Sequence, residues 1–159
     1  INYSRFYPVN WLKFHKGCRP KSGETSDCAQ SIGFQAKLGT IIGELPPYEA
    51  FCLGGASSVR GWSACDLGVA RNYGEATGEY RFPIWRLVSG VIFIDAGSDF
   101  GSQSTVPGRP GEILEKPGSG FSVGPGAVIN TPVGPIRIEA ATQDLSGNWR
   151  YNIGIGWKF

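Results

Sequence analysis

Apolar and polar residues alternate along most of the chain with a period of two. The pattern is clearest near the end, where one face carries large apolar side chains: Trp149, Tyr151, Ile153, Ile155, Trp157 and Phe159. A period of two places successive side chains on opposite faces of a β-strand, and helical spacing extends nowhere beyond one turn. Comparable alternation predicts seven strands in all, over residues 1–9, 34–42, 73–84, 88–96, 121–129, 136–140 and 148–159.

The face opposite the apolar one carries charged or small residues. In the strand predicted over 73–84, that face holds Glu75, Thr77, Glu79 and Arg81. Such a face suits a water-filled lumen, and a face with large rings suits lipid, as in outer-membrane barrels. A soluble β-sandwich or a lipocalin-like barrel shows the same alternation with the faces reversed, and it stays an alternative.

The connections between the predicted strands are of two kinds. Short proline-bearing turns occur at 82–86 and 130–135, whereas long glycine-rich loops occupy 44–72 and 101–119. Short turns on one side and long loops on the other are typical of outer-membrane barrels, whose tilted strands need about 9 to 11 residues. Such barrels have even strand numbers, so further strands are expected before Ile1. The predicted fold class is all-β, a segment of a transmembrane antiparallel β-barrel.

Composition and charge narrow the class of protein further. The chain has 24 glycines and 11 prolines, but 41% hydrophobic and 13% aromatic residues predict burial rather than disorder. No apolar run approaches the roughly 18 residues of a membrane-spanning helix. The net charge of +2 is scattered along the chain, so we expect no nucleic-acid partner. With no Met and a start at Ile1, we treat the chain as part of a longer protein.

Residues suited to catalysis or metal binding are scarce. His15 is the only histidine, so the chain has almost no residues from which to build a Ser-His-Asp arrangement or a histidine metal site. Asp95 and Asp99 are interpreted as wall and loop residues rather than as an acid–base pair. We therefore expect no enzymatic activity, no cofactor and no metal.

The four cysteines, Cys18, Cys28, Cys52 and Cys65, lack the CxxC spacing of zinc or redox sites. Two disulfides, formed in an oxidising compartment, are the simplest account of them. Free buried thiols are the alternative.

Residues 52–62 read Cys-Leu-Gly-Gly-Ala-Ser-Ser-Val-Arg-Gly-Trp. This segment resembles the loop motif of the BamA-type outer-membrane assembly factors, also called bacterial surface antigens or the outer membrane protein 85 kDa group. Their motif is Gly-Gly, a short polar spacer, and then Val-Arg-Gly-aromatic. Other segments fit the family in the same order: 44–51, 79–84, 93–97, 118–120, 132–138 and the terminal Phe159. Segments 105–108 and 116–120 most resemble the cyanobacterial and chloroplast-envelope branch.

The resemblance implies a barrel of about sixteen strands preceded by POTRA domains, with this chain as its last seven strands. In the family, the long loop, here about 44–72, folds back into the lumen, and its tip arginine binds an acidic residue of the wall. Arg60 carries over as that arginine and Asp95 as its partner, with Glu79 as a second candidate. The remaining residues expected in this loop lock are Gly54, Gly55, Val59, Gly61 and Trp62.

Alternation by itself places Asp95 and Phe93 on the face opposite Ile92 and Ile94. Arginine suits the expected role because its planar guanidinium can hold a carboxylate with two parallel hydrogen bonds. A lock that only steadies the barrel and a lock that acts as a functional switch look alike in sequence, so both interpretations stay open.

The resemblance also suggests where the cysteines lie and how they could pair. Cys52 and Cys65 bracket the loop tip, and a disulfide between them would tie off the base of the hairpin. Cys18 and Cys28 would close the loop between the first two strands. Both pairings are hypotheses that the family pattern does not demand.

By resemblance, the function is to insert or translocate other β-barrel proteins at an outer membrane, with no cofactor or nucleotide. The expected partners are outer-membrane lipid, unfolded β-barrel clients, accessory assembly subunits and POTRA domains. The barrel's first and last strands would part as a lateral gate and pair with a client strand. The expected gate and C-terminal signal residues are Trp149, Tyr151, Gly154, Gly156, Trp157 and Phe159.

Other functions fit the same pattern. A dedicated two-partner-type secretion channel, a chloroplast protein-import channel or a passive pore is the alternative, and a soluble β-sandwich binding module is a third. The expected location is a cyanobacterial-type outer membrane, with the chloroplast outer envelope as the alternative.

Overall fold

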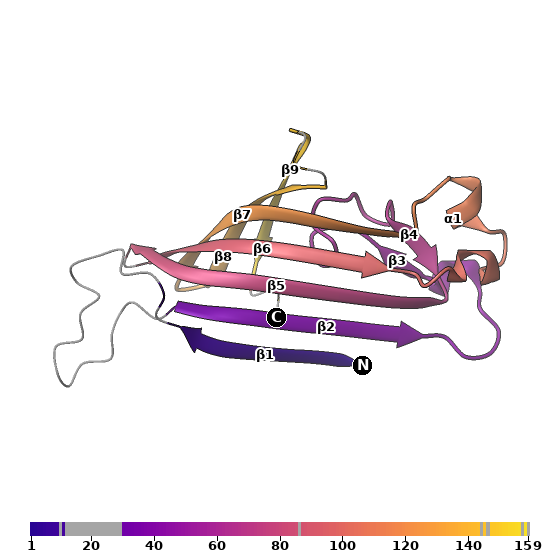
Figure 1. Cartoon of the computed structure of the whole chain (residues 1–159), viewed down its shortest axis with the longest axis horizontal. Helices are drawn as coiled ribbons and strands as arrows, with labels where there is room; N and C mark the ends of the chain where they lie inside the picture. Colours follow the sequence, from indigo (N-terminus) through magenta and orange to yellow (C-terminus); the bar gives the residue numbers. More distant parts are fainter. Residues whose placement is uncertain are drawn as a thin grey trace.

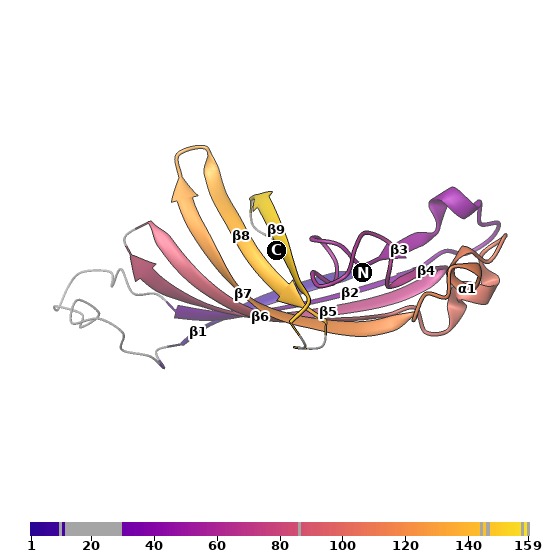
Figure 2. The same cartoon turned by 90° about the horizontal axis from the view of Figure 1, so that it is seen from above.

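The computed structural model describes residues 1–9, 11, 30–85, 87–143, 145, 147–156 and 158. Seven antiparallel strands form one sheet in the order β1-β2-β5-β6-β7-β8-β9. Their bounds are β1 (Asn2–Val9), β2 (Gln30–Thr40), β5 (Asn72–Trp85), β6 (Val88–Ser98), β7 (Ser119–Thr131), β8 (Gly134–Thr142) and β9 (Trp149–Ile155). The sheet is twisted and strongly curved, like a section of a barrel wall (Figures 1 and 2).

The seven strands predicted from alternation are all present, although their bounds differ. The strand predicted over 34–42 is β2, which ends at Thr40 opposite Asn72, the first residue of β5. Ile42, the last residue of the predicted strand, lies beyond β2 with 91% of its surface exposed. The predicted end of the strand was wrong because pairing with the neighbouring strand, rather than the length of the alternation, determines where a strand ends.

The two faces of the sheet differ sharply in exposure. On β6, Ile92 and Ile94 are 56% and 54% exposed, whereas Phe93 and Asp95 are 2% and 1% exposed. The exposed face is the apolar one, as in a barrel whose outer surface contacts lipid. The polar face is therefore the covered one, and what covers it comes from the long loops.

A second, two-stranded sheet accounts for much of this cover. It pairs β3 (Phe51–Leu53) with β4 (Gly68–Ala70) and lies on the concave side of the large sheet (Figure 2). Strands of three residues are too short to show alternation, so sequence patterns did not identify them. We call residues 51–70 the tip hairpin.

Short helical turns occur in the long loops: η2 (Pro47–Glu49), η3 (Ser102–Thr105) and α1 (Pro110–Ile113). Among the described residues, no helix has the length and apolar character needed to span a membrane.

Buried apolar side chains attach the tip hairpin to its surroundings. Leu53, Val59 and Leu67 are completely buried and form one cluster, with Tyr73 of β5 packed against it. A second cluster of buried side chains, formed by Leu45, Val69 and Val106, joins the connection between β2 and β5 to the one between β6 and β7. Full burial of one such side chain contributes about 1.5–3 kcal/mol. The hairpin is therefore a packed part of the fold, and its tip has a defined place on the wall.

Candidate functional site

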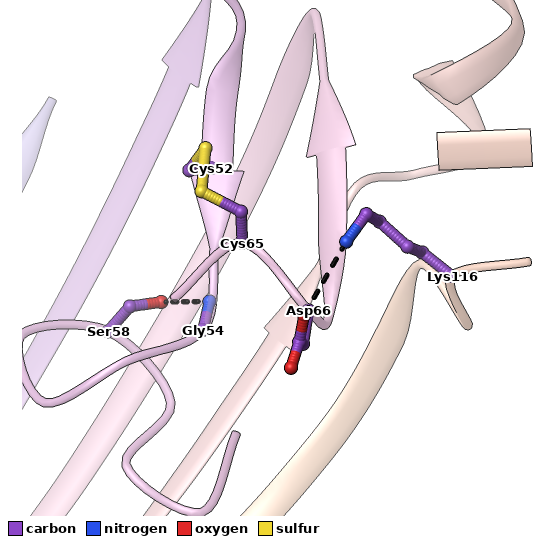
Figure 3. The surroundings of a disulfide bond; sticks show 6 residues. All are labelled: Cys52, Gly54, Ser58, Cys65, Asp66 and Lys116. Atoms are coloured by element: carbon purple, nitrogen blue, oxygen red, sulfur yellow. Dashed lines mark hydrogen bonds and ion pairs between the residues drawn. A yellow bond between two sulfur atoms is a disulfide. The ribbon is translucent and has the colours of Figure 1, made fainter. Parts of the chain in front are cut away.

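The tip hairpin is shaped at its base by a disulfide and a tight turn (Figure 3). Cys52 and Cys65 form the disulfide. The N–H of Gly54 donates a hydrogen bond to the Ser58 hydroxyl at 3.0 Å. Gly54 has a φ of +108°, and a Cβ there would lie 2.4 Å from the carbonyl oxygen of Ser63, so glycine is required. The turn that carries the tip is thus determined by local contacts.

The other side of the hairpin is attached to the loop that follows α1. The Asp66 carboxylate lies 3.6 Å from the Lys116 ammonium (Figure 3). The N–H of Gly118 donates to the carbonyl of Leu67 at 2.7 Å. Gly55, at the start of the tip, also has a positive φ, +100°. These contacts hold the hairpin at the end of the sheet where β6 and β7 are joined.

Arg60, at the tip, is completely buried against β6. Its Nε donates to Asp95 Oδ2 at 2.7 Å and its Nη2 donates to Asp95 Oδ1 at 2.8 Å. This bidentate pairing matches the planar guanidinium to the carboxylate. The main-chain N–H of Arg60 also donates to Asp95 Oδ2, at 3.1 Å. Asp95 therefore positions both the backbone and the side chain of the tip.

Two more carboxylates bind the same guanidinium from neighbouring strands. The Nη1 atom of Arg60 donates to Glu79 on β5 and to Glu139 on β8, each at 2.8 Å. The Arg60 Cζ lies 3.4 Å from the ring centroid of Phe93, so the ring covers one face of the guanidinium. One loop side chain is thereby bound by three strands of the wall. We call Arg60, Asp95, Glu79 and Glu139 the Arg60 cluster.

Strand register explains why Asp95 can serve as the centre of this cluster. Thr77, Asp95 and Ser122 are directly opposite one another on β5, β6 and β7. The Thr77 hydroxyl donates to Asp95 Oδ1 at 2.9 Å, and the Ser122 hydroxyl donates to Oδ2 at 3.4 Å. Small hydroxyl side chains on both sides satisfy the carboxylate and leave room for the tip above it.

Further cations balance the remaining charge of the cluster. Arg81 donates to Glu79 Oε2 at 2.7 Å. Arg137 lies 3.4 Å from Glu139. Buried charges are costly unless they are paired, and each carboxylate here has at least one cationic partner.

The electrostatics keep Arg60 permanently charged. Burial by itself lowers the pKa of Arg60, but the hydrogen bond and charge of Asp95, with the charges of Glu139 and Glu79, outweigh it and raise the pKa above its ordinary value. A guanidinium with a raised pKa stays protonated over the whole physiological range. The cluster is thus a fixed ionic anchor for a loop.

Of the other residues expected in the loop lock, Val59, Gly61 and Trp62 lie near the wall, whereas Gly54 and Gly55 lie against other residues of the hairpin. Val59 belongs to the buried cluster beneath the hairpin. A Cβ on Gly61 would lie 2.7 Å from Ser122 Cβ and 3.2 Å from the carbonyl oxygen of Thr142, so the tip backbone lies close against the wall there. The indole N–H of Trp62 donates to the carbonyl of Phe121 at 3.2 Å.

Of the expected gate residues, Trp149, Tyr151 and Gly154 lie on β9, at an edge of the sheet, and the structure does not bring them into the Arg60 cluster. Tyr151 is 77% exposed on the outer face, and Trp149 is 42% exposed. Gly154 faces Arg137, and Gly156 has a φ of +96° just after the strand. Several residues singled out from the sequence lie outside the described residues: His15, Cys18, Cys28, Trp157 and Phe159.

Two residues of the site were missed by sequence reasoning: Glu139, and Lys158, whose ammonium donates to Asp95 Oδ1 at 3.1 Å. Phe93 was placed on the polar face of its strand, but its contact with the guanidinium was not expected. Glu139 had a usable signal, because it shares the polar face of its strand with Arg137. Lys158 lies on the same face of the C-terminal alternation as Gly154. Which polar residues converge on Arg60 depends on strand order, which alternation does not reveal.

The residues of the site are suited to holding a loop in place rather than to binding a metal ion. Within the described ranges, no group of three or more His, Cys, Asp or Glu side chains is arranged to hold a metal ion. The carboxylates of the Arg60 cluster are already bound to arginine. The arrangement fixes a loop to the inner side of a wall.

A curved antiparallel sheet with an apolar outer face and a loop bound to its polar inner face defines a transmembrane β-barrel protein. The chain belongs to the Omp85 superfamily: the family model described as "Omp85 superfamily domain" matches residues 1–159. It is accordingly an outer-membrane protein. The resemblance to BamA-type proteins is confirmed, and the soluble β-sandwich alternative was wrong.

The chain is also similar to two proteins of Arabidopsis thaliana that are named as chloroplast proteins. It is 43% identical to "Outer envelope protein 80, chloroplastic" of Arabidopsis thaliana over 161 residues, which cover 99% of this chain and 22% of that protein. It is 38% identical to "Protein TOC75-3, chloroplastic" of the same plant over 76% of this chain and 14% of that protein. The chain thus spans less than a quarter of the length of these relatives.

Among solved structures, BamA from Haemophilus ducreyi lacking POTRA domains 1–3 matches with a TM-score of 0.59 at 15% identity. The match covers 95% of this chain and 32% of the BamA chain. At this identity the likeness concerns the fold, and it confirms that the sheet is a segment of a BamA-like barrel.

Proposed function

We propose that this chain is the C-terminal wall segment of a barrel that inserts or translocates β-barrel proteins at an outer membrane, without enzymatic chemistry or a cofactor. The observation that carries the proposal is the Arg60 cluster, in which carboxylates from β5, β6 and β8 bind one loop residue. Because the tip hairpin lies on the concave side of the sheet, it occupies the lumen once further strands complete the barrel.

The geometry supports different roles for two parts of the wall: β5 to β8 surround the bound tip hairpin, and β9 forms the edge of the gate. The tip hairpin crosses β5 to β8, so its ionic anchor keeps that part of the wall together. β9 lies at the sheet edge, where its outer backbone groups are available to another strand. A client strand can pair with such an edge by β-augmentation when the barrel's first and last strands part. The anchored region thereby keeps its shape while the gate opens.

The partners follow from this division. The exposed apolar face binds membrane lipid, the gate edge binds unfolded client strands, and POTRA domains and accessory subunits of the full-length protein deliver the clients. For the membrane, we propose the chloroplast outer envelope or its cyanobacterial counterpart. Supporting this choice are the relatives named as chloroplast outer envelope proteins, at up to 43% identity.

A dedicated channel, for two-partner-type secretion or chloroplast protein import, is the second candidate. The observation in its favour is the similarity to a chloroplast protein named TOC75-3, at 38% identity. A passive pore is less compatible with a hairpin packed against the lumen side of the wall.

The proposed function is tested with the full-length protein reconstituted in liposomes. We compare the rate at which an unfolded β-barrel client becomes protease-resistant in the membrane for wild type, Arg60→Ala and Arg109→Ala. Arg109 is the matched control because it pairs with Glu112 in an exposed loop. We expect Arg60→Ala to lower the insertion rate at least about tenfold, since the loss of a buried ionic partner costs several kcal/mol.

Two outcomes contradict the proposal. A folded barrel runs as a compact band on a gel when the sample is not heated. If Arg60→Ala still gives that band and inserts the client at the wild-type rate, the Arg60 cluster has no part in insertion. If a non-barrel precursor crosses the liposome membrane while a β-barrel client is not inserted, the dedicated channel takes its place.

A further inference from the structure

The end of the chain reaches the same carboxylate that anchors the tip hairpin. Lys158 follows β9, and its ammonium donates to Asp95 Oδ1 at 3.1 Å and to the carbonyl oxygen of Ser58 at 2.8 Å. Its side chain is only 1% exposed. A buried lysine is unfavourable unless its charge is paired, so these two contacts determine where Lys158 lies.

Two residues of β9 contact the tip hairpin from the same face. Asn152 Nδ2 donates to the carbonyl oxygen of Arg60 at 3.1 Å. Arg150 Nη1 donates to the hydroxyl of Ser63 at 2.8 Å. Positions 150 and 152 share one face of β9 by the strand period of two. The terminal strand is thus bound to β8 through its backbone and to the tip hairpin through its side chains.

Charge neutrality does not require Lys158 in this place. The three carboxylates of the Arg60 cluster already have three cationic partners: Arg60, Arg81 and Arg137. Lys158 adds a fourth cation beside Arg60, which repels it. The burial of Lys158 is therefore offset by its bonds to Asp95 and Ser58, one on the wall and one on the hairpin.

We propose that Lys158 is a positioning residue that couples the terminal strand to the tip hairpin, so that the two are released together. Lys158 joins Asp95 on β6, Ser58 on the hairpin and the end of β9 at one ammonium group. This inference rests on the proposed function in one respect: β9 is the strand that parts when the gate opens. Moving β9 then loosens the hairpin, and a loosened hairpin frees β9.

The coupling is tested by hydrogen exchange of the full-length protein in lipid nanodiscs, without any client. The variants are Lys158→Met, which keeps an unbranched apolar stem and removes the charge, and Lys116→Met as the matched control. Lys116 is a largely buried lysine that lies 3.6 Å from Asp66 of the hairpin, away from β9. In Lys158→Met we expect exchange to become at least about tenfold faster in both 54–64 and 149–156.

The control and the outcomes separate coupling from plain stabilisation. Lys116→Met leaves exchange over 149–156 at the wild-type rate if the coupling runs through Lys158. Faster exchange over 149–156 alone in Lys158→Met means that the lysine only steadies the strand end, and it overturns the proposal. Unchanged exchange in both segments overturns it as well.

A second variant, Asn152→Ala, is used if Lys158→Met does not fold, that is, if it gives no compact band on a gel run without heating the sample. This variant removes only the amide donor to Arg60, and we expect faster exchange in the same two segments. Wild-type exchange over 54–64 in Asn152→Ala would then reject the coupling. Because no client is present, these results are independent of the insertion assay, where an unchanged rate in Arg60→Ala counts against the proposed function alone.

Discussion

Arg60 and Asp95 lie 35 positions apart in sequence, yet Asp95 binds both the guanidinium and the main-chain N–H of Arg60. A side chain bonded only through its charged group can swing about its stem. An added backbone bond removes that freedom and fixes the position of the chain itself. The pair therefore holds the tip hairpin on β6 as a rigid body, and this suggests experiments on each part of the contact.

Removing the guanidinium should cost more than exchanging it for an ammonium. We expect Arg60→Ala to lower the free energy of unfolding by about 3–5 kcal/mol, because it leaves buried carboxylates without their partner. Arg60→Lys should have a smaller effect in the same direction, since lysine keeps the charge but not the two parallel bonds. Urea titration of the full-length protein in lipid, read by gel mobility, measures both. Equal stability of Arg60→Lys and wild type contradicts the bidentate anchor.

The disulfide should stabilise the hairpin by restricting its unfolded chain. Cys52 and Cys65 are separated by 13 positions, and closing such a loop contributes about 2–4 kcal/mol. We expect the paired variant Cys52→Ser and Cys65→Ser to show faster proteolysis within 54–64. The matched control is reduction of the same variant with a dithiol, which should change its proteolysis no further. If the double variant resists proteolysis as well as wild type does, the disulfide does not stabilise the hairpin.

Close approach at Gly61 should make even one methyl group harmful. A Cβ there meets Ser122 Cβ at 2.7 Å, and the carbonyl carbon of Thr142 lies at 3.1 Å. We expect Gly61→Ala to displace the tip and lower the temperature at which the compact gel band is lost. Gly78→Ala is the matched control, because its Cβ meets Ile94 Cγ2 at 3.4 Å, an ordinary contact. Similar melting of both variants rejects a tight tip–wall contact.

A charge on the outer face should be unfavourable only where lipid covers it. Ile94 is 54% exposed on the apolar face of β6. We expect Ile94→Arg to destabilise the barrel in lipid by about 2–4 kcal/mol, the cost of an arginine near the bilayer midplane. Leu114→Arg, at a 64% exposed loop position, should have little effect. Urea titrations in lipid compare the two, and equal stabilities contradict the assignment of the outer face.

Much of the fold could be predicted from the sequence, because strand alternation depends only on local geometry. A period of two identified the seven strands and placed Asp95 on the face opposite Ile94. Arg60 and Asp95 were paired through a motif resemblance, and the structure shows that they are in contact. The short strands β3 and β4 were beyond this approach, because three residues give no measurable period.

The sequence by itself determined the class of fold, the two faces of each strand and the residues of the tip. Only the tertiary structure decided that Glu139 shares Arg60 with Glu79, and that Lys158 shares Asp95 with Arg60. These contacts join residues up to 79 positions apart. They depend on the order, register and curvature of the strands, which bring distant side chains to one point. Alternation shows which way a side chain faces, and strand packing decides what it meets there.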